Sequence, residues 1–263
     1  AEKAAADLKP GEILLLENLR YHKEEKKNDP EFAKQLAALA DIAVNDAFGV
    51  SHRAHAANVG ITSYLESVAG YLMAKEIKFI GQTLEAPQRP FVAIIGGAKV
   101  SDKIGVISNM IDKVDKIIIG GGMAHTFDAA KGLPIGNSIC EKDKFEEALG
   151  QLKKAEEKGV QVVLPADLTI ADKFAADANT QIVDVDKVPE GWEALDSGPK
   201  TCELYVEALK GAKTVIWNGP MGVFEFDAFA TGTLKVAEAV AEATEQGAIS
   251  IVGGGDSIAA LKK

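Results

Sequence analysis

Short apolar runs alternate with amphipathic segments along the chain. In the second half, the apolar runs are FVAIIGG, KIIIGGG, VQVVLP, TVIWNGP and AISIVGGG. Helical patterns such as SDKIGVISNMIDKV, KDKFEEALGQLKKAEEKG and TCELYVEALKGA separate these runs. Continuously apolar strands that are connected by helices indicate a parallel sheet covered on both faces. The pattern therefore predicts an α/β fold.

The first half shows the same rhythm in a weaker form, with strand patterns in EILLLEN and DIAVNDAFG and a helix pattern in PEFAKQLAALA. A long amphipathic stretch without proline runs from about Ser67 to Glu85 and ends at APQRP. We interpret this stretch as a helix that joins two α/β lobes. A crossover helix within one sheet is the alternative, and the change in strand character after Pro90 favours two lobes. The predicted organisation is an N-terminal lobe (1–66), a hinge helix (67–88) and a C-terminal lobe (89–263).

The region from Pro165 to Pro199 differs from the rest of the second half. It carries scattered proline, aspartate and glycine, and it holds one short strand candidate, QIVDVD. We expect this region to form an excursion at the rim of the C-terminal sheet.

Composition and charge narrow the functional classes. The 263 residues are 47% hydrophobic, which suits one large or two ordinary globular domains. A net charge of -10 argues against a broad nucleic-acid or anionic-membrane surface, although a local basic cleft remains compatible with it. No apolar run approaches the ~20 residues of a membrane span, and the two cysteines lack paired spacing. We therefore expect a cytoplasmic protein with reduced cysteines and no membrane or nucleic-acid partner.

Four strands of the second half end in glycine-rich loops. The loops are GGAKVSDK (96–103), GGGMA (120–124), WNGPMGVFE (217–225) and GGGDS (253–257). Ligands of open α/β sheets bind beyond the carboxyl ends of the strands, so the loops predict one shared crevice. The sequence contains neither G-x-x-x-x-G-K-[ST] nor G-x-G-x-x-G with its downstream acid. A nucleotide site of another kind is favoured over a dinucleotide-dependent dehydrogenase.

Two lysines and an aspartate follow these glycines. Lys99 and Lys103 are four residues apart at the start of a predicted helix, so a phosphate chain could meet both ammonium groups. The alternative is a pair of solvated surface lysines. Asp256 could be a helix N-cap, or it could hold Mg²⁺ beside a triphosphate.

Other loops offer further polar groups. Asn218 supplies an amide, and Glu225 could accept hydrogen bonds from ribose hydroxyls, although a tight turn with an exposed glutamate explains the segment equally well. In the first half, Arg20 and Arg53 follow predicted strands, and arginines suit a small phosphorylated acid. The histidines that flank Arg53 lack a nearby cysteine or acid cluster and do not indicate a metal site.

Together, ENLRYH, NDAFG-SHRAH, LE-P-RPF-AI-GGAKVSDK, GGGMA-TF, WNGPMGVFE and GGGDS resemble phosphoglycerate kinase, in that family's order. The resemblance implies a monomeric two-lobed enzyme that closes about a hinge. Its N-terminal lobe would bind 3-phosphoglycerate, and its C-terminal lobe would bind ATP or ADP with Mg²⁺. The implied reaction is reversible phosphoryl transfer between 1,3-bisphosphoglycerate and ADP, which gives 3-phosphoglycerate and ATP.

The resemblance also assigns roles to residues. Arg20 and Arg53 match the arginines that hold the phosphoglycerate. Lys99 matches the lysine on the transferred phosphoryl group, which the backbone of Gly254 and Gly255 also faces. The matching nucleotide-binding positions are Gly97, Lys103, Gly121, Gly122, Asn218, Glu225 and Ser257.

Asp256 matches the acid that binds magnesium in the family. A carboxylate acceptor is already ionised near neutral pH, so its phosphorylation needs no general base, and the sequence offers no convincing one. Positioning and charge neutralisation by lysines, arginines and Mg²⁺ suffice.

Some family segments are absent from this sequence. These are the V-D-[FL]-N-V-P and L-G-R-P runs and the S-L-E-x-L segment that follows GGGDS. The absence of the first two runs, compared with the family, implies that the N-terminal lobe is incomplete. The chain also starts without methionine and stops soon after its last helix pattern begins, which suggests a fragment or a processed product. Two hypotheses remain: an active kinase, and a nucleotide-binding fragment without catalysis.

Overall fold

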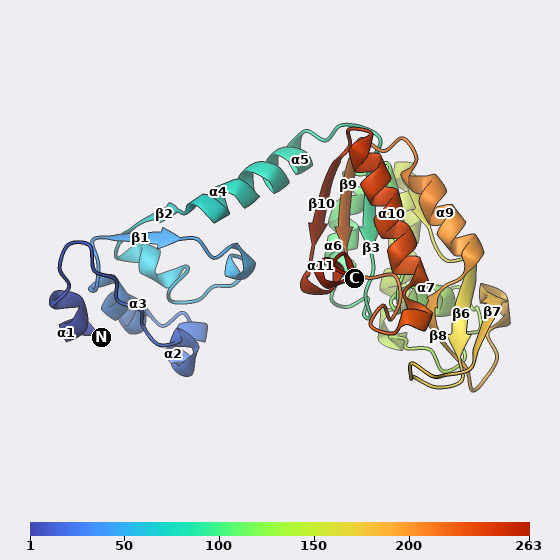
Figure 1. Cartoon of the computed structure of the whole chain (residues 1–263), viewed down its shortest axis with the longest axis horizontal. Coiled ribbons are helices and arrows are strands. Elements are labelled where there is room, and N and C mark those ends of the chain that lie inside the picture. Colours follow the sequence, from blue (N-terminus) through green and yellow to red (C-terminus); the bar gives the residue numbers. More distant parts are fainter. The chain divides into compact units, whose positions relative to one another are not determined.

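The computed structural model describes residues 1–263, and the chain forms two compact units, Ala1–Gln82 and Thr83–Lys263 (Figure 1). The first unit contains a two-stranded parallel sheet, in which β1 (Ile42–Asn45) pairs with β2 (Glu66–Ala69). Its short helices are α1 (Glu2–Ala6), α2 (Lys23–Lys26) and α3 (Pro30–Ala37), together with the 3₁₀ turns Leu19–Tyr21, Phe48–Val50 and Gly60–Ser63.

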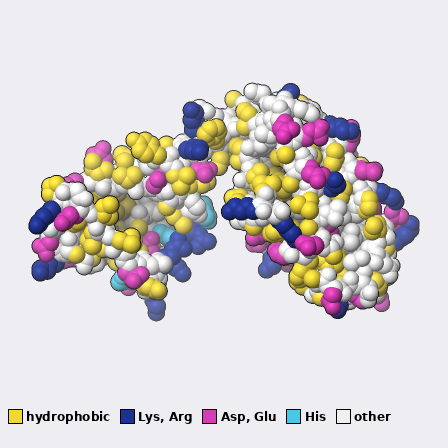
Figure 2. Space-filling model, viewed as in Figure 1, with side chains coloured by type: hydrophobic (Ala, Val, Ile, Leu, Met, Phe, Trp, Pro, Cys, Tyr) yellow, Lys and Arg dark blue, Asp and Glu magenta, His cyan; other side chains and the backbone are white.

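The first unit departs from the predicted strand in EILLLEN. Residues 12–18 are irregular, and the side chains of Ile13 and Leu15 are 94% and 93% exposed. Neither β1 nor β2 contains a fully buried residue. Hydrophobic side chains are correspondingly visible on the surface of this unit in Figure 2. An apolar strand needs a partner and a cover to be stable, and this segment has neither, so its apolar pattern does not produce a strand.

The predicted helix from Ser67 starts later than expected. Residues 66–69 pair with β1 as β2, and the helix begins as α4 (Tyr71–Glu76). It continues through a π-helical turn (Ile77–Gly81) into α5 (Gln82–Glu85). The Asp46 carboxylate accepts a hydrogen bond from the backbone N–H of Met73 at 2.9 Å, so it caps the start of the helix.

The second unit is built on a five-stranded sheet with the strand order β10-β9-β3-β4-β5. Every adjacent pair is parallel, as the apolar runs predict. The strands are β3 (Phe91–Ile95), β4 (Lys116–Ile119), β5 (Gln161–Val163), β9 (Thr214–Asn218) and β10 (Ile249–Gly253).

Both faces of this sheet are covered by helices. Alternate residues of β3 enter two different cores: Ala93 packs with residues of α6 (Ile104–Ile111), α7 (Ala124–Ala130) and α8 (Phe145–Lys158), whereas Ile94 packs with residues of α9 (Pro199–Leu209) and α10 (Thr231–Glu245). The prediction of a doubly covered parallel sheet is confirmed. The short helix α11 (Gly255–Ala260) follows β10. None of the helices combines the length and the apolar character needed to cross a membrane.

The region expected as a rim excursion contains a second, antiparallel sheet. Its strands are β6 (Asp167–Ala171), β7 (Thr180–Asp184) and β8 (Glu193–Ser197), in the order β7-β6-β8. The sequence analysis identified only the strand candidate that overlaps β7. β6 is nearly fully buried, whereas the first residues of β7 are exposed. The exposed strand is rich in polar residues, and a proline precedes β6. The sequence therefore lacks the clear alternation of apolar and polar residues by which strands of an antiparallel sheet are recognised.

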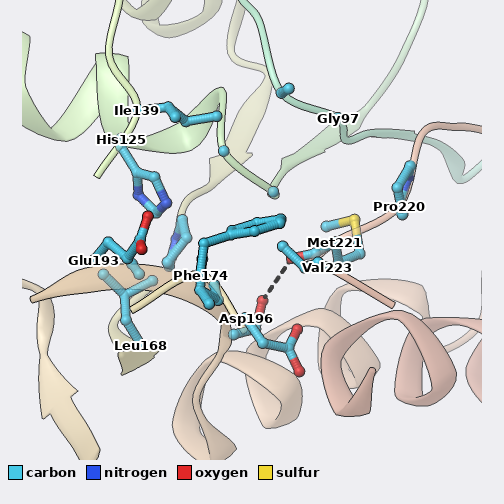
Figure 3. Close-up of a pocket in the computed structure, with 18 of the residues that line it drawn as sticks. Gly97, His125, Ile139, Leu168, Phe174, Glu193, Asp196, Pro220, Met221 and Val223 are labelled. Carbon is cyan, nitrogen blue, oxygen red and sulfur yellow. Dashed lines mark hydrogen bonds between the residues drawn. The ribbon is translucent and has the colours of Figure 1, made fainter. Parts of the chain in front are cut away.

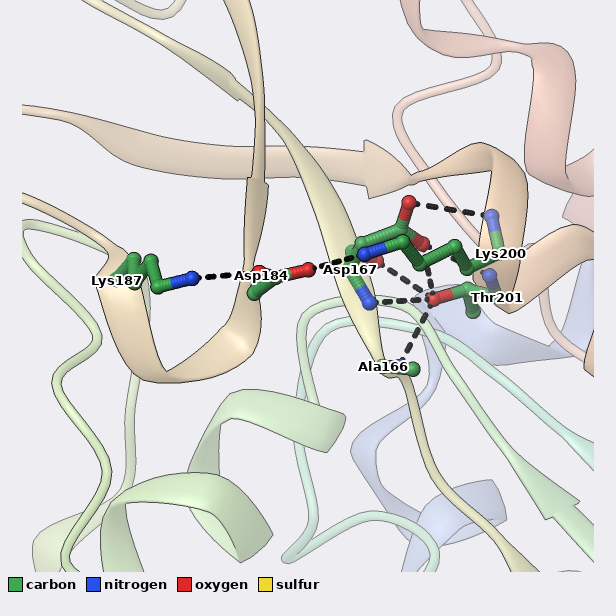
Figure 4. A network of polar contacts seen from close by, with 6 residues as sticks. All are labelled: Ala166, Asp167, Asp184, Lys187, Lys200 and Thr201. Atoms are coloured by element: carbon green, nitrogen blue, oxygen red, sulfur yellow. Dashed lines mark hydrogen bonds and ion pairs between the residues drawn. The ribbon is translucent and has the colours of Figure 1, made fainter.

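A buried aspartate attaches this sheet to α9 (Figure 4). The carboxylate of Asp167 accepts hydrogen bonds from the backbone N–H groups of Lys200 (3.1 Å) and Thr201 (2.8 Å) in the first turn of α9. The Thr201 hydroxyl in turn accepts the Asp167 backbone N–H at 2.9 Å. A Cβ atom at position 198 would clash with the Asp167 carboxylate, and the residue there is Gly198. A residue of β6 therefore caps a helix that has no capping side chain of its own.

Candidate nucleotide site

The carboxyl ends of the central strands are joined to one another by backbone hydrogen bonds. The N–H of Gly96, after β3, donates to the carbonyl of Asn218 at 3.0 Å, and the N–H of Gly97 donates to the carbonyl of Pro220 at 2.9 Å. The N–H of Gly120, after β4, donates to the carbonyl of Ile95 at 3.1 Å. The loops after β3, β4 and β9 therefore meet at one edge of the sheet, as the sequence predicts.

Close packing explains several of the glycines at this edge. A Cβ on Gly96 would run into the Gly219 and Pro220 carbonyls, and a Cβ on Gly121 would lie 2.8 Å from the Gly97 nitrogen. Gly97 is different, because its φ is +110° and no atom lies within 4 Å of its Cβ position. Glycine is thus required at Gly96 and Gly121 by contacts between loops, whereas at Gly97 it is required by the backbone conformation.

A cavity of about 280 Å³ lies beside these loops (Figure 3). Among the residues that line it are several that the sequence analysis predicted for the site: Gly97, Gly121, Gly122, Glu225 and Asp256. The sequence analysis did not predict its apolar walls, which are formed by Ile139, Leu168, Phe174, Met221 and Val223. A mostly apolar slot with a few polar groups at its edge suits a flat aromatic base. Phe174 and Leu168 belong to the region expected as an excursion, and an isolated apolar residue carries no signal for such a role.

The remaining predicted nucleotide ligands lie near this cavity without lining it. The Asn218 amide nitrogen is 3.4 Å and 3.5 Å from the Cβ positions of Gly253 and Gly254, so Asn218 lies against the glycine triplet. The Ser257 hydroxyl accepts a hydrogen bond from the backbone N–H of Gly219. Gly255 begins α11, and open space surrounds its Cβ position.

The two lysines of the loop after β3 lie in different surroundings. Lys103 is half-buried, and burial lowers its pKa, although the nearby charges of Asp102 and Asp256 oppose this shift. Lys99 is exposed, and its ammonium group is close enough to Glu141 to lower the pKa of that carboxyl. Asp256 thus lines the cavity and its charge acts on the half-buried Lys103, whereas Lys99 is exposed on the same loop.

Several buried titratable groups lie in and below the cavity. Burial lowers the pKa of His125 to about 4, and a hydrogen bond with the Ala194 backbone opposes this shift. Burial raises the pKa of Asp196 to about 7 against hydrogen bonds from backbone N–H groups, among them that of Gly232 at 3.0 Å. Burial also raises the pKa of Asp128 to about 6. At neutral pH the His125 imidazole is therefore uncharged.

The predicted phosphoglycerate ligands belong to the first unit. Arg20 lies in a 3₁₀ turn, with its backbone N–H bonded to the Asn18 side chain at 3.0 Å. Arg53 is exposed, and its Nε donates to Nε2 of His52 at 3.3 Å. His55 is buried, and its Nδ1 lies 3.9 Å from the Glu25 carboxylate. The structure contains no group of three or more His, Cys, Asp and Glu side chains that could hold a metal ion.

The main sheet is parallel and is covered by helices on both faces, and its glycine-rich loops meet beside a cavity. These features define the class of this protein. It is an α/β protein with a cavity at the carboxyl edge of its parallel sheet, which is the edge where open α/β sheets bind their ligands. The model of the phosphoglycerate kinase family matches residues 1–263. The chain belongs to the phosphoglycerate kinase family.

Individual relatives agree with this assignment. The chain is 59% identical over 262 residues to the phosphoglycerate kinase of Moorella thermoacetica, which it covers to 66%, and 56% identical to the chloroplastic phosphoglycerate kinase of Volvox carteri, which it covers to 57%. The solved structure of phosphoglycerate kinase from Coxiella burnetii matches 97% of this chain with a TM-score of 0.87 and 44% identity, and 65% of that chain is covered. The chain thus spans two thirds or less of the length of these relatives.

Proposed function

We propose that the chain carries out the phosphoglycerate kinase reaction, the reversible transfer of a phosphoryl group between 1,3-bisphosphoglycerate and ADP to give 3-phosphoglycerate and ATP. The second unit binds the nucleotide, and the first unit supplies Arg20 and Arg53 to the phosphoglycerate. The observation that carries the proposal is the arrangement at one sheet edge. There, Asp256 lines a cavity of about 280 Å³ whose walls are mostly apolar, and the charge of Asp256 acts on the Lys103 ammonium.

The proposed chemistry needs positioning and charge stabilisation. In the direction of ATP consumption, the bond between the γ-phosphorus and the bridging oxygen breaks, and a bond to a carboxylate oxygen of 3-phosphoglycerate forms. The bridging oxygen leaves with ADP, and no proton has to be moved because the acceptor is already ionised. Lys103 neutralises charge on the nucleotide phosphates, and Lys99 neutralises charge on the group in transfer. Asn218, Ser257, Gly254 and Gly255 line the phosphate side.

Asp256 is the proposed magnesium ligand. Its carboxylate is exposed beside Lys103 at the cavity edge, which fits an ion that one or two carboxylates hold together with phosphate oxygens and water. Bound there, Mg²⁺ would neutralise negative charge on the nucleotide phosphates. Glu225, which lines the same cavity, accepts hydrogen bonds from the ribose hydroxyls in this proposal.

The test is a coupled assay of ATP-dependent phosphorylation of 3-phosphoglycerate, with Lys99→Ala purified in parallel to reveal contaminating host enzyme. The proposal expects activity that the substitution lowers by about 100-fold or more, since the lost charge faces the developing transition state, while the affinity for MgADP changes much less. Activity that is equal in both preparations would refute it.

A second candidate is nucleotide binding without turnover. It is favoured by the difference between the two units, because the second unit has a sheet covered on both faces, whereas the strands of the first unit contain no fully buried residue. Tight MgADP binding together with no activity above that of Lys99→Ala would select this candidate. Protease cleavage confined to the residues before about Ser67 would support it further.

A further inference from the structure

The loop after β3 that carries Lys99 and Lys103 is anchored at several points. At its start, the Gly97 carbonyl accepts the backbone N–H of Met123 at 2.9 Å. In its middle, the side chain of Val100 is fully buried in the core that contains Ala93. Lys103 is the N-cap of α6, and its carbonyl accepts the backbone N–H of Ile107 at 2.8 Å, whereas Lys99 precedes the helix and is not held by it.

Glu141 provides a further anchor from a distant part of the sequence. Its Oε2 accepts the backbone N–H of Ser101 at 2.9 Å, and its Oε1 accepts the Ser101 hydroxyl at 2.6 Å. Ser101 is the midpoint between the two lysines. A carboxylate that accepts two hydrogen bonds from one residue fixes both the position and the orientation of that residue.

Glu141 is itself held in place. Its backbone N–H donates to the hydroxyl of Thr126 at 3.1 Å, and Thr126 is 1% exposed on α7. The connection therefore runs from a buried helix through Thr126 and Glu141 to Ser101. Helix α7 follows the glycine-rich loop after β4, so two of the loops at the candidate site are joined through this carboxylate.

The charge state of Glu141 suits this role. The hydrogen bond from the Ser101 hydroxyl is the main cause that holds the pKa of Glu141 below its usual range, and the Lys99 ammonium contributes in the same direction. The carboxylate therefore remains ionised and accepts both hydrogen bonds at neutral pH. Unlike Glu147, which pairs with Lys144 at 2.6 Å, Glu141 places both of its oxygens on the loop.

We propose that Glu141 is a positioning residue for phosphoryl transfer, which holds Ser101 so that Lys99 is presented to the terminal phosphate of a bound nucleoside triphosphate. This inference rests on the proposed function, because it assigns Lys99 to the group in transfer. Glu141 acts through the loop and does not touch the phosphate. Its loss should therefore weaken the recognition of the terminal phosphate more than that of ADP.

Calorimetric titrations with MgADP and with the magnesium complex of a non-hydrolysable ATP analogue test this inference without requiring turnover. The quantity compared is the ratio of the two dissociation constants. We expect Glu141→Ala to reduce the preference for the triphosphate by about three- to tenfold, the weight of one typical hydrogen bond, with ADP affinity within about twofold. Ser101→Ala should have a smaller effect, because the backbone hydrogen bond to Glu141 remains.

A double-mutant cycle with Lys99 supplies the decisive readout. In the Lys99→Ala background, Glu141→Ala should change the ratio no further, because the group that it positions is gone. Glu147→Ala is the matched control, since this exposed acid contacts Lys144 and not the loop, and it should leave the ratio unchanged.

Several outcomes would overturn the inference. Equal losses of ADP and triphosphate affinity would make Glu141 a structural residue only, and so would additive effects of the Lys99 and Glu141 substitutions. If Glu141→Ala does not fold, an unaltered ratio in Ser101→Ala has the same meaning. If the unmodified chain binds neither nucleotide, the proposed function fails and the inference fails with it. Nucleotide binding with an unaltered ratio in Glu141→Ala refutes the inference alone.

Discussion

The Ser257 hydroxyl accepts a hydrogen bond from the backbone N–H of Gly219 at 2.7 Å. Ser257 is fully buried at the start of α11, and Gly219, with a φ of +99°, lies in the loop after β9. This contact joins the glycine triplet at the end of β10 to the neighbouring strand end. Ser257 therefore satisfies a buried backbone group, and its hydroxyl hydrogen remains able to donate to the nucleotide to which the resemblance assigns it.

Ser257→Ala should lower the free energy of unfolding by about 1–3 kcal/mol, because it leaves the Gly219 N–H without a partner in a buried position. Urea unfolding measures the change. Ser250→Ala is the matched control, because the Ser250 hydroxyl contacts only the exposed Thr244 hydroxyl, and its effect should stay within about 0.5 kcal/mol. Equal effects of both substitutions would show that the contact between the two loops is not important for stability.

Asp256→Asn should remove most of the magnesium dependence of ADP binding. The expected loss of affinity is about tenfold when magnesium is present, and little change is expected when it is absent. Calorimetric titrations of ADP with and without Mg²⁺ measure both values. Glu225→Gln serves as the comparison, because a contact with the ribose should weaken ADP binding equally in both conditions. An unchanged magnesium dependence in Asp256→Asn would leave Asp256 as a helix-terminal residue only.

Asp128→Asn should stabilise the protein above about pH 6. Asp128 is 2% exposed, and neither of its carboxylate oxygens has a hydrogen-bond partner, so burial raises its pKa to about 6. The folded state then holds the proton more tightly than the unfolded state. The stabilising contribution of Asp128 is therefore fully present below about pH 4, and up to about 3 kcal/mol of it is lost as the pH rises through 6. The difference between variant and wild type, from urea unfolding, should be largest near pH 7.5 and fade near pH 4. A pH-independent difference would contradict this explanation.

His125→Phe should show the opposite pH dependence. His125 is buried with Nδ1 unpaired, and burial lowers its pKa to about 4. The unfolded chain therefore binds the proton more tightly, so the stabilising contribution of neutral His125 is fully present above about pH 6.5 and is lost as the pH falls towards 4. The variant has no histidine to protonate at this position. The free energy of unfolding of the variant minus that of the wild type, measured with urea, should therefore be greater near pH 5 than near pH 7.5. An advantage that grows as the pH rises would refute the assignment.

Asp167→Ala should lower the free energy of unfolding by about 2–4 kcal/mol, because two backbone N–H groups of α9 and the Thr201 hydroxyl lose an acceptor. Asp167→Asn keeps one acceptor oxygen and should cost less. Lys187→Ala is a suitable control: its exposed ion pair with Asp184 is worth less than about 1 kcal/mol. A loss in Asp167→Ala no larger than that of the control would show that α9 does not depend on this cap.

The sequence predicts the features that local patterns encode. Continuous apolar runs such as FVAIIGG predict the parallel strands, and the glycines that follow four of these runs predict the crevice. The first unit is different, because a strand there depends on a pairing partner from another segment of the chain. EILLLEN lacks such a partner and forms no strand, whereas residues 66–69 pair with β1 and form β2. The apolar cavity wall, which includes Phe174 and Ile139, likewise depends on which segments fold next to one another. Glu141 contacts a serine forty residues away, and no spacing rule connects them.

The glycines that pack against one another at the sheet edge decide which positions of this site tolerate substitution and which do not. Gly96, Gly121 and Gly219 leave no room for any side chain, since each Cβ would press against the backbone of another strand end. A substitution at one of them would displace its neighbour as well. Redesign of the base preference is therefore confined to the side chains around the cavity, such as Ile139 and Val223, where a change of shape leaves the phosphate-side backbone in register.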